Sequence, residues 1–191
     1  MADLKDSGAR RDFASGAVRD IAEGKGRCDL LPLGVIARLL SDTPSEYDEV
    51  LVNIGMYVYN GETTDLLRAI IHFCNSRGWD ICTAMLEVSK HYEDGARKYS
   101  ARNWEKGIDL HCYIDSGVRH YLKYKRGDDD EPHDRAFIWN MLGAVWTHHN
   151  KPELIDLPFN EKRCCVAPDI AEDTSKTRTE KKKSYIETCF G

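Results

Sequence analysis

Three groups of charged and polar side chains have the types and spacing that could do chemistry. The first lies in the stretch SGAVRDIAEGKGRCDLLP, which places Arg19, Lys25 and Arg27 among glycines. Glycine lets backbone amides approach an anion closely, and nearby cations add favourable charge. These three cations are therefore candidates for contacts to an anion, although composition alone favours a loop that binds none. An ordered N-terminal loop lying over the core, without a ligand, would have the same composition.

The second group lies in DICTAMLEVSKHYEDGARKY, which has helical periodicity. Glu87, His91, Asp94 and Lys98 step by four, three and four residues, so they share one helix face. At about 100° per residue, this face lies roughly 130° from the apolar stripe of the same helix. A solvated face is therefore expected unless another segment covers it. The next segment, YSARNWEKG, is a possible cover in which Tyr99 and Trp104 can stack on a base.

The third group is an acidic turn with its flanking helices. RGDDDEPHD carries five carboxylates in the seven residues 128–134, and Asp115, Arg119 and His120 precede it. Carboxylates crowded in this way repel one another unless solvent or a hard cation such as Mg²⁺ intervenes. An acidic turn also stabilises a helix N-terminus without any metal. Asp134 lies one turn before the apolar Ile138, so its carboxylate is expected to point toward the edge of the helix bundle.

The elements that must position these groups are helices. Apolar spacing of three, four and seven, with Ser, Thr, Asp, Gly and Pro at the boundaries, predicts six of them. We expect helices over residues 30–40, 45–61, 63–78, 80–99, 110–125 and 134–149. The second is expected to open at Ser45, and the stripe of the fourth to comprise Ile81, Met85, Val88, Tyr92 and Tyr99. No segment shows strand alternation, so the fold class is an all-α bundle of about six helices.

Length and composition indicate one globular domain. The chain has 191 residues, of which 41% are hydrophobic and 31% charged. We expect a helical domain over residues 1–159, with an irregular basic loop at 1–29. Residues 160–191 lose the apolar periodicity and gain charge, which predicts a flexible tail.

The net charge and the cysteines indicate which classes of partner and which cell compartment are expected. The formal net charge of −5 disfavours a general coat for a nucleic-acid polymer, which needs a basic surface. No apolar run has the length of a membrane span, and the N-terminus lacks the apolar segment of a signal peptide. The seven cysteines read as reduced thiols, and the adjacent Cys164 and Cys165 lack the C-x-x-C spacing of a zinc site. We expect a cytoplasmic protein with no membrane and no nucleic-acid partner.

Three stretches of sequence carry a resemblance to a known family. GAVRD with EGKGRCDLLP, HYEDGARKYSARNWEKG and VRHYLKYKRGDDDEPHDRAFIWN resemble the phage-associated dATP/dGTP diphosphohydrolase N-terminal domain. The blocks G-A-x-K-Y…N-W and R-H…H…W-N are the specific part of the likeness. That family is similar to the MazG-like all-α nucleotide pyrophosphohydrolases. The likeness covers about residues 7–146, and residues 41–79 are a possible helical insertion within it.

The resemblance implies a reaction. A (deoxy)nucleoside triphosphate, with a purine base, would be cleaved between the α and β phosphates, giving monophosphate and pyrophosphate. The setting would be control of a phage or prophage nucleotide pool in the host cytoplasm. The superfamily generally completes its sites in homo-oligomers, so a dimer or tetramer is implied.

The resemblance also implies a metal site with Mg²⁺ or Mn²⁺ as cofactor. The ions would be held by an E-x-x-E helix and an E-x-x-D helix, and EPHD supplies the second spacing with Glu131 and Asp134. E-x-x-E is absent, because Lys90 stands three residues beyond Glu87. Glu87 with His91 or Asp94 would have to substitute. On this basis Glu87 and Asp134 are the candidate catalytic residues.

The ligand contacts that follow are of two kinds. The candidate phosphate-binding residues are Arg19, Lys25, Arg27, Lys98, Arg119 and His120, and the candidate base-binding residues are Tyr99, Asn103 and Trp104. The missing second glutamate keeps an alternative open. A non-catalytic nucleotide-binding protein, which sequesters a nucleotide signal used in host anti-phage defence, needs the cations and aromatic rings but no complete metal site.

Overall fold

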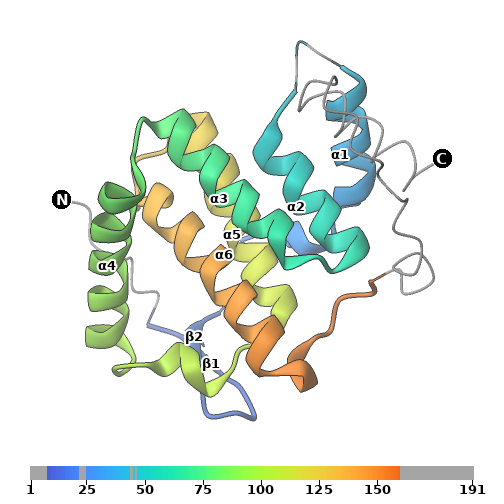
Figure 1. The fold of residues 1–191 in the computed structure, drawn as a ribbon. Helices are drawn as coiled ribbons and strands as arrows, with labels where there is room; N and C mark the ends of the chain where they lie inside the picture. The colour runs from blue at the N-terminus through green and yellow to red at the C-terminus, as the bar shows by residue number, and fades with distance from the viewer. Residues whose placement is uncertain (1–7, 22–24, 44, 46, 160–191) are drawn as a thin grey trace.

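The chain forms an all-α bundle with a small β-hairpin (Figure 1). The computed structural model describes residues 8–21, 25–43, 45 and 47–159, so the tail predicted for residues 160–191 lies outside the described residues. The helices are α1 (Leu33–Asp42), α2 (Glu49–Asn60), α3 (Thr63–Arg77), α4 (Ile81–Lys98), α5 (Leu110–Arg126) and α6 (His133–Asn150). All six helices expected from the sequence are present, and the fold class is confirmed.

Local capping explains where the helices begin and end. Asp48 caps α2 by accepting hydrogen bonds from the amides of Val50 and Leu51, both at 3.1 Å. The expectation that this helix opens at Ser45 was therefore wrong by three residues. Gly61 and Gly78 end α2 and α3 with φ angles of 75° and 73°, a left-handed conformation that favours glycine.

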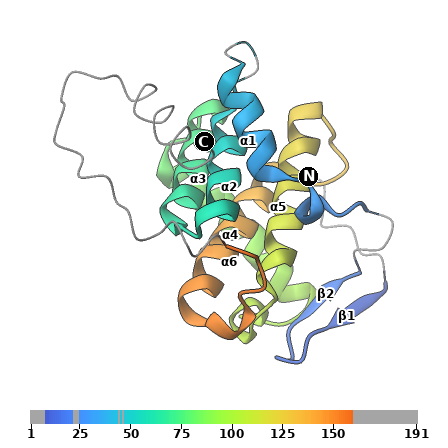
Figure 2. The ribbon, with the colours of Figure 1, turned by 90° about the vertical axis from the view of Figure 1, so that its right-hand side faces the viewer.

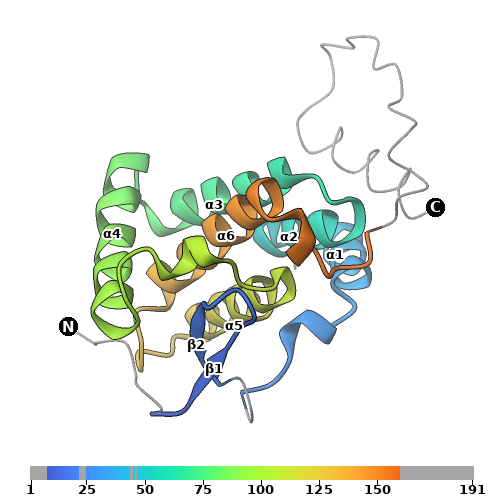
Figure 3. The ribbon, with the colours of Figure 1, turned by 90° about the horizontal axis from the view of Figure 1, so that it is seen from below.

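Helices α5 and α6 form the centre of the bundle. Helices α3 and α4 pack on α6, and α2 packs on α3 and carries α1 on its other side. Figures 1 and 3 show α4 and α1 at opposite ends of the molecule with α5 and α6 between them. Phe73 of α3 contacts Phe137 of α6 and Tyr121 of α5 at ring-centroid distances of 4.8 and 6.1 Å. The segment 41–79 thus contributes to the same hydrophobic core as α5 and α6.

The N-terminal stretch contains two strands that the sequence did not lead us to expect. β1 (Arg10–Asp12) pairs antiparallel with β2 (Val18–Asp20), with Arg11 opposite Arg19. Figure 2 shows this hairpin beside α5. The strands are too short for apolar alternation to reveal them. The hairpin is held by tertiary contacts, since both ends of the Asn103 amide bond the backbone of Val18, at 3.1 Å to its nitrogen and 2.9 Å to its oxygen.

Helix α4 is rotated about its axis relative to the expected orientation. Ala84, Val88 and His91 face the core, whereas Ile81 and Met85 of the predicted stripe are 53% and 39% exposed. The solvated face expected for Glu87, His91, Asp94 and Lys98 is corrected in the same way, because His91 is buried and Lys98 is nearly so. The physical reason is that α6 and the hairpin offer charged and polar partners to this face.

A smaller correction concerns α5. The apolar spacing of this helix predicts Ile114, Val118, Tyr121 and Leu122 as inward residues. The first three are buried, but Leu122 is 40% exposed. Within the described residues, no helix is both long and apolar enough to cross a membrane.

Candidate functional site

A cavity of about 900 Å³ lies between the hairpin, α4, α5, α6 and the loop that follows α4. This volume is at the upper end of the roughly 300–1,000 Å³ of small-molecule sites. The loop contains the 3-10 helix η3 (Asn103–Lys106). Predicted site residues from all three groups line the cavity: Arg19, Lys25, His91, Lys98, Tyr99, Asn103, Trp104, Arg119, His120 and Glu131.

Positive charge is in excess at the cavity although the whole chain is acidic. Six cationic and four acidic side chains line it. Several of the cations are already paired: Arg102 with Glu105, and Lys123 with Asp130 at 3.1 Å. The excess favours an anionic ligand.

Arg19 is held against the wall of the cavity by hydrogen bonds and rings. Its guanidinium donates to the backbone oxygen of Cys112 at 3.1 Å and to Oδ1 of Asn140 at 2.9 Å. It also lies 5.4 Å from the ring centroid of Tyr113 and 5.5 Å from that of Trp139. Within the part of the chain that the structure describes, Arg19 forms no ion pair, so its charge is not neutralised by a carboxylate.

Asp20 joins the hairpin to the end of α4. Its carboxylate accepts from Lys98 Nζ at 2.7 Å, from the Tyr99 hydroxyl at 2.9 Å and from Arg10 at 2.8 Å. Partial burial opposes ionisation, but the hydrogen bonds from Lys98 and Tyr99 hold the pKa of Asp20 below its ordinary value. Lys98 and Tyr99, predicted to bind phosphate and base, thus already have a partner in this structure.

Arg119 and Arg27, the other predicted phosphate-binding arginines, differ in position. Arg119 lines the cavity and forms a two-point contact with Asp115 at 2.9 and 3.0 Å. Arg27 does not line the cavity, and its guanidinium pairs with Asp29. A phosphate contact from Arg27 stays a prediction that would require this pair to open.

Aromatic rings form an apolar part of the lining. The ring of Trp104 lies edge-on to that of Tyr92 with the centroids 5.8 Å apart. The ring centroids of Tyr92 and Trp139 are 6.1 Å apart. All three rings line the cavity. Trp146, which does not line the cavity, packs edge-on against Trp104 with the ring centroids 5.1 Å apart. The base-stacking prediction for Trp104 is thus compatible with its position, while the amide of Asn103 is engaged in attaching the hairpin.

Two histidines and two carboxylates meet at the edge of the cavity. His120 Nδ1 lies 2.9 Å from His133 Nδ1, and His133 Nε2 contacts Asp130 at 2.8 Å. Glu131 lies 4.0 Å from His120, and His120, Glu131 and His133 have the composition of a metal site. Burial and the neighbouring His133 lower the pKa of His120 well below its ordinary value, so its imidazole is neutral near pH 7.

His91 is the most deeply placed titratable residue of α4. Burial, with Arg135 and Arg19 nearby, lowers the pKa of its imidazole to about 4. The side chain lines the cavity, and its Nδ1 has no hydrogen-bond partner among the described residues. A buried polar atom of this kind is a point at which a ligand or water can bind.

Three of the predicted metal or catalytic residues do not line this cavity. Glu87 pairs with Lys90 and with Arg135 of α6, and these cations hold the pKa of its carboxyl below the ordinary range. Asp94 pairs with Arg97 at 3.2 Å. Asp134 lies 3.5 Å from Arg77 and lines a smaller hollow that it shares with Glu131. The structure therefore does not bring Glu87 and Asp94 together with Glu131.

Several residues of the site were not among the predicted ones. His133 and Asn140 are buried, and their spacing of seven on one helix stripe was the signal that they need polar partners. Asp20 and Trp139 had no signal of their own in the sequence. Two partners of Asp20, Lys98 and Tyr99, lie 78 and 79 residues away, and the rings around Trp139 lie on other helices.

Comparison with known proteins identifies a family for part of the chain. No curated protein and no solved structure matches the chain. Residues 78–157 match the family described as dATP/dGTP diphosphohydrolase, N-terminal. This range supplies the cavity lining except Val18, Arg19, Asp20, Ile21 and Lys25. The resemblance to the dATP/dGTP diphosphohydrolase N-terminal family is thereby confirmed for residues 78–157, the part of the chain that builds most of the site.

Proposed function

We propose that the protein is a metal-dependent hydrolase of (deoxy)nucleoside triphosphates that cleaves between the α and β phosphates. One observation carries the proposal: a single cavity combines unneutralised positive charge, stacking rings and a carboxylate–imidazole cluster. The family match over residues 78–157 supplies the substrate class, a purine deoxynucleoside triphosphate.

The cavity supports separate roles for its two sides. Tyr92, Trp104 and Trp139 offer ring faces and edges for a base. Arg19, Lys25 and Lys123 would spread the charge of the phosphate oxygens. Enclosure by the hairpin would hold the triphosphate chain near the His120 cluster and exclude bulk water from it.

The residues at the cavity edge fit a divalent cation. His120 Nδ1 and His133 Nδ1 are 2.9 Å apart, and Asp130 bonds the far nitrogen of His133 as outer carboxylates do for metal-bound histidines. Two imidazoles with Glu131 suit Mn²⁺ better than Mg²⁺, which prefers oxygen ligands alone. A bound ion would acidify a coordinated water and screen the phosphates. We therefore propose Glu131, His120 and His133 as its ligands.

The test is incubation of the purified protein with the four deoxynucleoside triphosphates and Mn²⁺ or Mg²⁺, followed by separation of products. We expect monophosphate and pyrophosphate, loss of activity with chelator, and recovery with Mn²⁺. Glu131→Gln should lower the rate by orders of magnitude. Glu87→Gln and Asp134→Asn test the roles that the sequence predicted for those residues. Release of inorganic phosphate instead of pyrophosphate would contradict the proposed bond cleavage.

One observation favours the non-catalytic alternative. Glu87 is engaged by Lys90 and Arg135, and Asp94 by Arg97, so α4 presents no carboxylate to the cavity. A nucleotide-sequestering protein would bind the same ligands with the same cations and rings. Recovery of the nucleotide unchanged, but retained by the protein at equilibrium, would establish this alternative. The homo-oligomer, for which the resemblance is the only support, is proposed here as well and is tested by light scattering.

A further inference from the structure

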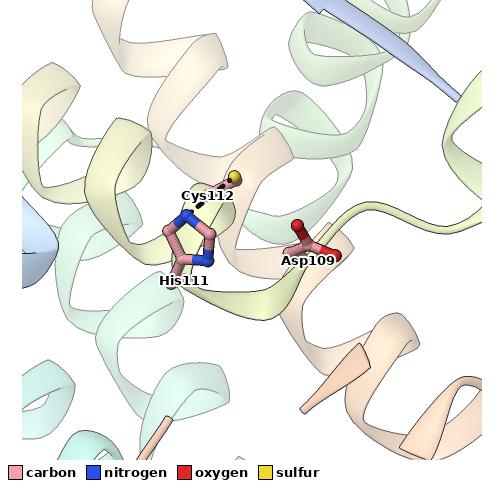
Figure 4. A group of neighbouring side chains, drawn as sticks. All are labelled: Asp109, His111 and Cys112. Atoms are coloured by element: carbon pink, nitrogen blue, oxygen red, sulfur yellow. Dashed lines mark hydrogen bonds between the residues drawn. The ribbon is translucent and has the colours of Figure 1, made fainter. Parts of the chain in front are cut away.

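A second cluster of metal-binding residue types lies outside the cavity, at the start of α5. Asp109 is the residue before the helix, and His111 and Cys112 belong to its first turn (Figure 4). One ligand atom from each lies within 4.8 Å of the other two. None of the three lines the nucleotide cavity. We propose that Asp109, His111 and Cys112 form a binding site for a borderline-soft divalent cation such as Zn²⁺.

The spacing of the ligand atoms supports this proposal. His111 Nε2 lies 3.3 Å from Cys112 Sγ, the contact drawn as a dashed line in Figure 4. A tetrahedral zinc ion with its usual bonds to nitrogen and sulfur places these atoms about 3.5 Å apart. Little movement is therefore needed for both to bind one ion, and Asp109 offers the third ligand.

A fourth residue orients the imidazole. Asp156, which follows the 3-10 helix η4 (Pro152–Leu154), accepts from the His111 backbone amide at 2.9 Å and also bonds His111 Nδ1. An ion would bind Nε2, the atom that faces Cys112, in place of a proton, while Nδ1 keeps its bond to Asp156. Carboxylates hold metal-bound histidines in this way. The site would consequently tie the segment after α6 to the start of α5.

The local charge also favours a cation. Asp109 and Asp156 bring negative charge to the cluster, and Arg11 of the hairpin contacts both Asp109 and Cys112. Its guanidinium lies 3.5 Å from Cys112 Sγ, 3.4 Å from Asp109 and 4.6 Å from the ring centroid of Phe13. Arg11 is 44% exposed, so it can leave when an ion binds. A thiolate ligand distinguishes Zn²⁺ from Mg²⁺ and Ca²⁺, which prefer oxygen.

The test is a Co²⁺ titration of the reduced, chelator-treated full-length protein. Co²⁺ reports on a zinc site because a thiolate ligand produces a near-ultraviolet charge-transfer band. We expect the band to saturate at one ion per chain and to disappear when Zn²⁺ is added. Cys112→Ser should abolish it, while Cys82→Ser, which changes an exposed thiol on α4, should leave it intact. Absence of the band, or its survival in Cys112→Ser, would overturn the proposal.

Further variants keep the test decisive if Cys112→Ser does not fold. Asp156→Asn should weaken Co²⁺ binding by about 10–100-fold, the usual effect of removing an outer carboxylate. Arg11→Gln should tighten binding, because it removes the competing charge. Equal Co²⁺ affinity in Asp156→Asn, Arg11→Gln and the unaltered chain would show that neither residue acts on the bound ion, and would refute the proposed site. Since no cysteine of the described residues lines the nucleotide cavity, the thiolate band is independent of the Mn²⁺ requirement proposed for hydrolysis.

Discussion

At the scale of single residues, His91 makes stability depend on pH. Burial lowers the pKa of its imidazole to about 4, whereas an unfolded chain has the ordinary value near 6.5. Between these values the unfolded state binds more protons, so stability falls as the pH drops below about 6.5. The full difference corresponds to about 3 kcal/mol. Urea unfolding from pH 7 to 4.5 should show a smaller loss in His91→Gln than in the unaltered protein. If the free energy of unfolding falls equally with pH in both proteins, His91 is not buried in its neutral form.

The Trp104 side chain packs against other rings and also faces the cavity. Its ring contacts Tyr92 and Trp146 and lines the cavity. Trp104→Ala should weaken nucleotide binding by roughly 1–3 kcal/mol if a base stacks there, and should also lower the melting temperature. Trp146→Ala is the control, because that ring supports Trp104 without lining the cavity. If the two variants lose stability alike and neither loses affinity in its folded fraction, Trp104 only packs the loop.

At the scale of elements, the contact between α1 and α2 depends on Gly55. A Cβ added there would lie 2.5 Å from both the Leu33 carbonyl oxygen and the Ala37 Cβ, so the two helices must separate. We expect Gly55→Ala to destabilise the protein by about 1–3 kcal/mol. Gly95→Ala is the matched control within α4, since nothing lies within 4 Å of its added Cβ. It should be neutral or stabilising by up to about 1 kcal/mol in chemical denaturation. Similar losses in both variants would contradict the tight α1–α2 contact.

At the scale of the whole molecule, the hairpin closes the cavity more than it supports the bundle. Its only fully buried apolar side chain among the described residues is Ala17. Deletion of residues 1–27 should therefore preserve the helical circular dichroism spectrum, with a lowered melting temperature. Nucleotide affinity should fall sharply, and its dependence on salt should flatten because Arg19 and Lys25 are lost. Loss of the helical spectrum would show instead that the hairpin is needed for folding.

Two point variants separate the hairpin's charge from its packing. Arg19→Ala removes the cation that bonds Asn140, and should cost about 1.5–3 kcal/mol of nucleotide affinity if a charge-assisted phosphate contact is lost. Arg27→Ala changes a cation outside the cavity, paired with Asp29, and should leave affinity unchanged. Isothermal titration with a non-hydrolysable triphosphate measures both. A larger loss of nucleotide affinity in Arg27→Ala than in Arg19→Ala would show that Arg27 contacts the phosphates.

The sequence by itself determined the six helices of this protein. Helix formation depends on apolar spacing within a few turns and on caps such as Asp48, Gly61 and Gly78, which are local properties. The family motifs were likewise local. Two of the three stretches that carry the resemblance lie within the matched range 78–157, and the stretch before Leu33 lies outside it. For the same reason some charges and rings of the site, among them Arg19, His120 and Trp104, could be named in advance.

Only the tertiary structure decided how these residues face one another. The rotation of α4, which buries His91 and exposes Ile81, depends on partners in α6 and the hairpin. The hairpin exists because Asn103, 85 residues away, bonds Val18, and Arg19 reaches Asn140 across 121 residues. Such contacts leave no periodic trace in the chain, because each joins residues whose separation in sequence is arbitrary. Whether a polar helix face is solvated or lines a site is settled by what packs against it.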